Sequence, residues 1–212
     1  MRLRFVVTGS GRCRTKWVSE ALTRAGVPCG HEAVFGPHEP SPWSEEPLLG
    51  DSSWMAATML DEIQEPVALL VRHPLAVIQS WVDIGFFSHD TGNPTHGPLR
   101  RFAPELYAPG RSPADQAAGM WHRLTYAGLI RAEMVLRVEQ FDTWMLARLI
   151  GWAGGQPRNA ALAYAETPPC NRHELSREIA GAQPSLRWSD LSPDEARPAA
   201  ELAKTLGYGA MS

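Results

Sequence analysis

The stretch Leu3-Arg-Phe-Val-Val-Thr-Gly-Ser-Gly-Arg-Cys-Arg-Thr-Lys-Trp17 joins three local signals in a fixed order. Residues 3–8 are β-branched and aromatic at their centre, which predicts a short buried strand. Gly9-Ser10-Gly11 then breaks the strand. Apolar residues recur at helical spacing from Thr15 to Ala25, and Gly26 is a typical stop after a helix. A strand, a glycine-containing loop and a helix in this order are typical of units that cradle a phosphate group.

Short apolar segments alternate with helical patterns along the rest of the chain. We expect further strands at Val27–Cys29, Pro66–Val71 and Met134–Val138. We expect further helices from Asp51 to Ile63, Pro74 to Gly85, Ser112 to Ala132 and Asp142 to Gly154, at 159–165, and from Ser192 to Gly207. This alternation predicts an α/β fold of three layers, α/β/α, with a mainly parallel sheet. The loop 9–16, Arg72 and the loop after Val138 should then share one edge of the sheet.

The composition indicates one ordinary domain, residues 1–212. The chain has 212 residues, of which 44% are hydrophobic and 20% charged. The proline-rich stretches 36–50 and 88–112 are expected to be loops or lids on this domain. A net charge of −3 argues against a nucleic-acid binder, and no apolar run approaches the length of a membrane span. Three cysteines, with no secretory signal and no C-x-x-C pair, predict a cytoplasmic protein without a metal site.

The net charge hides a strong local asymmetry. Residues 1–24 contain six basic residues against Glu20 alone, whereas residues 27–66 contain eight acidic residues and no Lys or Arg. A basic element beside an acidic stretch indicates a local anion site, although ordinary scatter of surface charge also fits the composition.

The loop does not match the pattern of a magnesium-nucleotide site, G-x-x-x-x-G-K-[ST]. Laid from Gly9, the pattern places Arg14 at its second glycine, Thr15 at its lysine and Lys16 at its hydroxyl residue. A shift by one residue places Trp17 where Ser or Thr should bind the metal. Because a magnesium-nucleotide site needs that hydroxyl, the sequence disfavours a working ATPase or kinase.

The same loop suits an anion that is bound without a metal. Arg12, Arg14 and Lys16 lie within five residues at the expected start of a helix. The free backbone N–H groups and the dipole of a helix N-terminus favour negative charge. The loop therefore predicts a metal-free phosphate or sulfate site.

Gly9-Ser-Gly-Arg-Cys-Arg-Thr-Lys-Trp17 resembles the 5′-phosphosulfate loop of sulfotransferases that use 3′-phosphoadenosine 5′-phosphosulfate, with the pattern [KR]-[SA]-G-T-[TS]-W. On this pattern Arg12 takes the basic position, Thr15 the phosphate-binding hydroxyl and Trp17 the closing aromatic. Arg14 stands where the family has a glycine, and Lys16 where it has a hydroxyl residue. The resemblance implies a cosubstrate site formed by Gly11, Arg12, Cys13, Arg14, Thr15, Lys16 and Trp17.

Leu70-Val-Arg72-His-Pro74-Leu-Ala-Val-Ile-Gln-Ser80 resembles the second signature of the family, R-[DHN]-P-x-x-x-x-x-S. The resemblance implies that Arg72 and Ser80 bind the 3′-phosphate. Arg72 ends a predicted strand and Ser80 lies about two turns along the next helix, so both can face one edge of the sheet. Four weaker segments are similar to bacterial members of the family: Gly30–Glu32, Ser52–Ala56, Arg137–Glu139 and Gly207–Tyr208. Arg172, in a late basic loop, is implied to cover the 3′-phosphate.

The resemblance implies a P-loop-like fold and transfer of a sulfuryl group to a hydroxyl or amine of a small-molecule acceptor. This chemistry needs a base for the acceptor proton and cations for the leaving phosphate oxygen. Arg12 and Lys16 are the expected cations. Glu32 is the expected base and His31 the second candidate, but an ion pair between Glu32 and the basic loop is an equal alternative.

Two other functions stay open at this point. One is a nucleotide or small-molecule kinase with a degenerate loop, and the other is a catalytically silent domain that binds a nucleotide or a partner. Trp17 is as well explained by core packing as by contact with an adenine ring. The aromatic residues in and directly before the proline-rich loops favour either an aromatic acceptor or anchoring of those loops: Trp43, Phe86, Phe87, Phe102 and Tyr107.

Overall fold

A computed structural model describes residues 3–36, 47–88, 93–168 and 185–209 of the chain. Its strands are β1 (Phe5–Gly9), β2 (Cys29–His31), β3 (Gly50–Ser52), β4 (Val67–Val71) and β5 (Ala132–Arg137). Its helices are α1 (Thr15–Arg24), α2 (Pro74–Asp83), α3 (His96–Phe102), α4 (Pro113–Arg131), α5 (Thr143–Trp152), α6 (Ala160–Glu166) and α8 (Pro193–Thr205). Short 3₁₀ helices are η1 (Met55–Thr58), η2 (Pro104–Tyr107), η3 (Val138–Gln140), η4 (Pro157–Asn159) and η5 (Trp188–Asp190). None of these described helices is long and apolar enough to cross a membrane.

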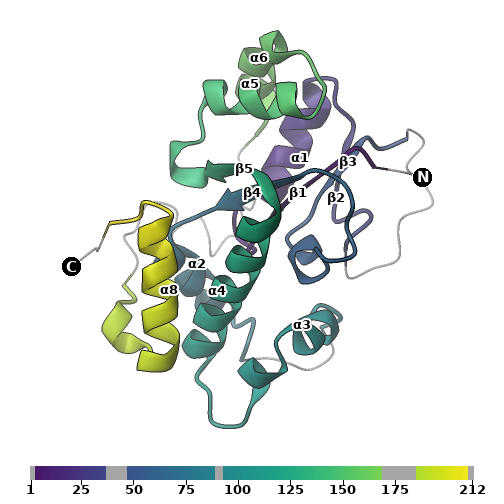
Figure 1. Ribbon diagram of the computed structural model, residues 1–212. Helices are drawn as coiled ribbons and strands as arrows, with labels where there is room; N and C mark the ends of the chain where they lie inside the picture. The colour runs from purple at the N-terminus through teal and green to yellow at the C-terminus, as the bar shows by residue number, and fades with distance from the viewer. Residues whose placement is uncertain (1–2, 37–46, 89–92, 169–184, 210–212) are drawn as a thin grey trace.

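The strands form one all-parallel sheet in the order β2-β3-β1-β4-β5. Helices α1, α5 and α6 pack together on one side of the sheet, and α2, α4 and α8 pack together on the other (Figure 1). On the first side, the ring of Trp17 meets the edge of Tyr164, and Trp152 meets Phe5 of β1. The chain is therefore an α/β protein with the predicted three layers.

The two central strands, β1 and β4, are buried along their whole length. An unbroken apolar run is typical of a parallel strand that is covered on both faces. Helix α4 crosses one face of the sheet, and Gly128 lets it approach Leu69 of β4 closely. The face of α4 that the sequence predicted to be apolar is buried: Ala117, Trp121, Leu124 and Gly128.

The prediction of a helix from Asp51 to Ile63 was wrong except for the short 3₁₀ helix η1. Residues 50–52 form β3 between β2 and β1, and only the short η1 follows. Gly-Asp-Ser has little intrinsic preference for a strand, so pairing on both sides decides its conformation. A Cβ atom on Gly50 would lie 2.2 Å from the Phe5 ring, which explains the glycine at this position.

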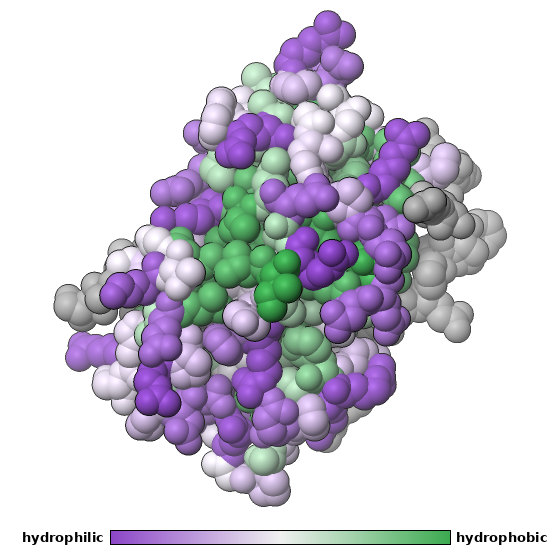
Figure 2. All heavy atoms as spheres, viewed as in Figure 1, coloured by the Kyte–Doolittle hydropathy of each residue, from purple (hydrophilic) through white to green (hydrophobic). Residues whose placement is uncertain are grey.

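The last strand, β5, is an edge strand and not the buried strand that we predicted. Its residues alternate in exposure, and Val135 is 39% exposed. On the face seen in Figure 2, apolar residues gather around the middle of the molecule, where β5 and the end of α4 lie. Ile130, in the last turn of α4, is also exposed. The second strand also differs slightly, since β2 begins at Cys29, where the predicted strand ended.

The stretch 88–112 is not simply a loop, because it contains α3 and η2. Leu99 and Leu106 anchor these two short elements in the core, where both are fully buried. His96 joins them, since its Nδ1 lies 2.9 Å from the Tyr107 hydroxyl and its Nε2 lies 3.1 Å from the carbonyl oxygen of Phe86. The aromatic residues at 86, 87, 102 and 107 are half-buried or buried, which fits the anchoring alternative. Of the stretch 36–50, residues 37–46, with Trp43, lie outside the described residues.

The close approach of α4 to β4 gives a stability prediction. A Cβ atom at Gly128 would lie 2.5 Å from Cδ1 of the buried Leu69, so Gly128→Ala overpacks the core. We expect Gly128→Ala to lower the free energy of unfolding by about 1–3 kcal/mol in urea titrations. The control is Gly151→Ala on the exposed side of α5, where a Cβ atom meets Pro157 at 3.2 Å. It should change the free energy by no more than about 1 kcal/mol, and an equal effect of both variants would contradict the tight packing.

Candidate functional site

The candidate site lies where the sheet changes the direction of its connections. From β1 the chain passes through α1 to β2 on one side, whereas from β4 it reaches β5 on the other side. Ligands of open parallel sheets bind at such a point, beyond the carboxyl ends of the strands. The loop 10–14 follows β1 and Arg72 follows β4, so this carboxyl edge holds both segments that the sequence singled out.

The loop after β1 has an unusual backbone. Gly11, Arg12 and Arg14 have positive φ values of 78°, 55° and 62°. Gly11 is also required by packing, since a Cβ atom there would lie 2.4 Å from the Trp81 ring. The buried thiol of Cys13 donates to the carbonyl oxygen of Gly11 at 3.1 Å and closes the turn. Turns of this kind gather backbone N–H groups into a concavity that suits an anion.

Helix α1 begins directly after this loop with an open N-terminus. Arg14 is its N-cap residue, and its side chain makes no capping hydrogen bond. The first backbone N–H groups of a helix lack intrahelical partners, and together with the helix dipole they attract negative charge. The side chains of Arg14 and Lys16 are exposed beside this N-terminus.

Three of the predicted residues meet at the loop from three different elements. Arg12 Nε donates a hydrogen bond to Ser80 Oγ of α2 at 2.8 Å. Arg72 Nη1 donates to the backbone carbonyl oxygen of Arg12 at 3.1 Å. Burial and the charge of Arg72 lower the pKa of Arg12. Two neighbouring guanidinium groups repel each other, so an anion between them would be strongly favoured.

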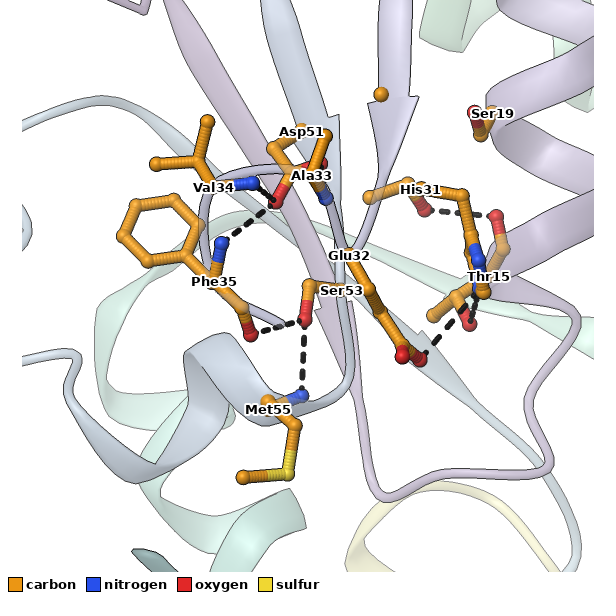
Figure 3. A network of polar contacts seen from close by, with 12 residues as sticks. Thr15, Ser19, His31, Glu32, Ala33, Val34, Phe35, Asp51, Ser53 and Met55 are labelled. Carbon is orange, nitrogen blue, oxygen red and sulfur yellow. Dashed lines mark hydrogen bonds and ion pairs between the residues drawn. The ribbon is translucent and has the colours of Figure 1, made fainter. Parts of the chain in front are cut away.

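A second group of predicted residues lies at the end of β2 (Figure 3). His31 Nε2 lies 3.4 Å from the Thr15 hydroxyl and 3.6 Å from Glu32 Oε1. Burial is the largest influence on His31 and lowers its pKa. The structure thus brings the two candidate bases to the first turn of α1, where the phosphate-binding hydroxyl was predicted.

Asp51 holds the turn that follows Glu32, and the sequence analysis missed this role. Its carboxylate accepts backbone N–H groups of Ala33, Val34 and Phe35 at 3.0–3.1 Å. Figure 3 shows these contacts. Glu32 itself has a positive φ of 54°. Gly50-Asp-Ser is typical of a turn, so the sequence carries little signal for a buried carboxylate at this position.

A similar contact holds the backbone after Arg72. Glu139 Oε1 accepts the backbone N–H of His73 at 2.7 Å, and Glu139 Oε2 accepts the Tyr208 hydroxyl at 2.9 Å. The Arg137 guanidinium lies 4.2 Å from the centre of the Tyr208 ring. Two of the weaker sequence segments, around residues 137–139 and 207–208, therefore meet at the carboxyl edge beside Arg72.

Two predicted residues do not join this group. Trp17 lies in the core, where its ring contacts the edges of Phe141 and Tyr164 and its Nε1 donates to the carbonyl oxygen of Thr167. This placement fits the core-packing alternative for Trp17. Arg172 lies outside the described residues.

Comparisons of the chain with protein-family models, with curated proteins and with solved structures find no match. The resemblance to sulfotransferases therefore stays a prediction that depends on the residues of this chain and their geometry.

The left-handed conformation of Arg14 gives a second testable prediction. A residue with a Cβ atom pays about 1–2 kcal/mol for this conformation, whereas glycine adopts it without strain. Arg14→Ala removes the charge and keeps the strain, and Arg14→Gly removes both. We expect Arg14→Gly to be more stable than Arg14→Ala by about 1 kcal/mol in urea unfolding. Equal stability of the two variants would show that Arg14 does not adopt this conformation in solution.

Proposed function

We propose that this protein is a sulfotransferase with a P-loop-like fold, which moves a sulfuryl group from 3′-phosphoadenosine 5′-phosphosulfate to a hydroxyl or amine of a small-molecule acceptor. The observation that supports this most is the meeting of Arg12, Arg72 and Ser80 beside the open N-terminus of α1. The backbone N–H groups at the start of α1 form one group of anion-binding atoms, and Arg72 with Ser80 forms a second. Two such groups suit a ligand with phosphates at both its 5′ and 3′ positions.

Each residue has a specific role in this proposal. The backbone N–H groups of the loop and of the first turn of α1 hold the 5′-phosphate, and the hydroxyl of Thr15 contacts it. Arg72 and Ser80 hold the 3′-phosphate. Arg12 and Lys16 stabilise the charge that develops on the bridging oxygen. The acceptor oxygen or nitrogen bonds to sulfur while the bond from sulfur to the phosphate oxygen breaks, and 3′-phosphoadenosine 5′-phosphate leaves.

The acceptor proton passes to Glu32 or to His31. Because burial lowers the pKa of His31, its ring is neutral near pH 7 and can accept a proton. Glu32 lies next to the His31 ring, which in turn lies close to Thr15. A base within reach of the transferring group is what the reaction requires.

Two further features are consistent with this proposal. The residue after Thr15 is Lys16, so the loop lacks the hydroxyl that magnesium-nucleotide sites place after their lysine. Cys13 and Cys29 are free buried thiols, which fits a reducing compartment, and we propose the cytoplasm.

The nucleotide preference tests this function. A ligand that binds only the native state stabilises it by about 2.7 kcal/mol at one hundred times its dissociation constant. We expect 3′-phosphoadenosine 5′-phosphate, in EDTA, to raise the melting temperature by about 5–10 °C. Arg72→Ala should remove most of this shift, because Arg72 binds the phosphate that ATP lacks.

The control variant is Arg158→Ala, an exposed arginine on η4, near the other end of α1. It should leave the shift intact. A larger shift with magnesium and ATP, abolished by EDTA, would support a kinase instead. Binding of the bisphosphate without any transfer of the sulfuryl group from the cosubstrate would support a silent nucleotide-binding domain, and no shift with either nucleotide would reject a nucleotide site.

The role of Glu32 gives a separate prediction. Glu32→Gln keeps the shape of the side chain but cannot accept the acceptor proton. We expect the turnover of the cosubstrate, with water or a small alcohol as acceptor, to fall by about 10²-fold, while the dissociation constant of 3′-phosphoadenosine 5′-phosphate changes little. Glu62→Gln, on the exposed segment after η1, is the control. Equal losses of binding and turnover would instead mark Glu32 as an ion-pair partner of the basic loop.

A further inference from the structure

Asp51 is a fully buried carboxylate that the proposed reaction does not use directly. It lies in β3, with none of its surface exposed, and its partners are the three backbone N–H groups of residues 33–35. A buried charge is costly unless hydrogen bonds satisfy it, and three N–H donors satisfy a carboxylate well. These hydrogen bonds link β3 directly to the segment that follows His31 and Glu32.

The backbone of this segment is shaped for the contact. A Cβ atom on Gly30 would lie 2.8 Å from Asp51 Oδ1, so the carboxylate lies directly against β2. A Cβ atom on Gly36 would lie 2.1 Å from the carbonyl oxygen of Glu32, so the turn is tightly closed. Glu32 takes a left-handed conformation that is unfavourable for a residue with a side chain, and it persists only when its surroundings hold it.

Ser53 closes the same turn from its far end. Its hydroxyl donates to the carbonyl oxygen of Phe35 at 2.9 Å and accepts the backbone N–H of Met55 at 3.1 Å. Figure 3 shows that Asp51 and Ser53 hold opposite parts of one turn, while Glu32 and His31 lie on its other side, toward Thr15. Ser53 is uncharged, so it offers a matched comparison for the charge of Asp51.

The charge of Asp51 also acts on His31. It raises the pKa of His31, as Glu20 on α1 does, while burial and Lys16 lower the pKa. Glu32, in the same turn, lies 3.6 Å from the ring. Loss of the Asp51 charge should therefore move the titration of His31 to lower pH.

We infer that Asp51 is a positioning residue, whose carboxylate holds the turn at residues 32–35 so that Glu32 and His31 lie beside Thr15. The catalytic consequence rests on the proposed function. The geometric part does not, because it concerns only where His31 and Glu32 lie.

The test is Asp51→Asn, which preserves volume but replaces one acceptor oxygen with an amide group. Three backbone N–H groups then face a side chain that can accept with one oxygen only, so the turn loses part of its support. We expect the turnover of the cosubstrate, with water as acceptor, to fall at least tenfold. The acidic limb of the pH profile of turnover should move to lower pH. The dissociation constant of 3′-phosphoadenosine 5′-phosphate should change less than threefold, because the nucleotide-binding residues come from other elements.

Nuclear magnetic resonance tests the geometric part without any activity. In the parent, a nuclear Overhauser effect should join the His31 ring to the Thr15 side chain; Asp51→Asn should weaken it and lower the pKa of His31. Ser53→Ala should leave the His31 titration unchanged. Should Asp51→Asn fail to fold, Asp51→Ser, which is smaller and equally uncharged, replaces it in every measurement.

The outcomes separate the two proposals. A parent that neither binds the bisphosphate nor turns over the cosubstrate rejects the proposed function, and the resonance measurements then decide the role of Asp51 alone. An unchanged His31 titration together with an intact contact to Thr15 overturns the positioning role. Turnover within threefold of the parent, or equal losses of turnover and nucleotide binding, also overturns it.

Discussion

The pairing of β1 with β4 is the constraint on which the rest of the structure depends. Both strands are fully buried, and their register places Gly9 beside Leu70. Because parallel strands end on the same edge, the loop after β1 and Arg72 after β4 are brought together by main-chain hydrogen bonds alone. Arg72 can then bond to the backbone of Arg12, and Arg12 can reach Ser80 on the helix that follows β4.

Two carboxylates, Asp51, which is fully buried, and Glu139, which is exposed, hold the turns on either side of this centre. Asp51 of β3 accepts the backbone N–H groups after Glu32, and Glu139 after β5 accepts the backbone N–H after Arg72. Asp51 lies in the strand beside β2, and Glu139 lies in η3, directly after the strand beside β4; each accepts hydrogen bonds from main-chain donors. The turns on both sides of the cationic loop are thus fixed through main-chain N–H groups.

Much of the fold could be predicted from local patterns. The strand at residues 5–9, the helix from Thr15, the strand at 67–71 and the helix from Pro74 all have strong signals, because their apolar spacing and their helix boundaries agree. The strand at 50–52 and the helix at 96–102 have none. The conformation of the strand at 50–52 is decided by β2 and β1, which pair with it on either side. The conformation of the helix at 96–102 is decided by the burial of Leu99 in the core.

For the candidate site, the sequence by itself determined which residues are chemically able to bind an anion, because the clustering of Arg12, Arg14 and Lys16 and the Arg72-His-Pro74 segment are local features. Only the tertiary structure decided which of these residues meet, and it separated Trp17, which packs in the core, from Arg12, which contacts Ser80. It also introduced Asp51 and Tyr208, whose roles depend on contacts across 16 to 69 positions of the chain. Such contacts leave little trace in the sequence, because a hydrogen bond to a main-chain N–H or to a distant carboxylate demands a position in space and not a pattern along the chain.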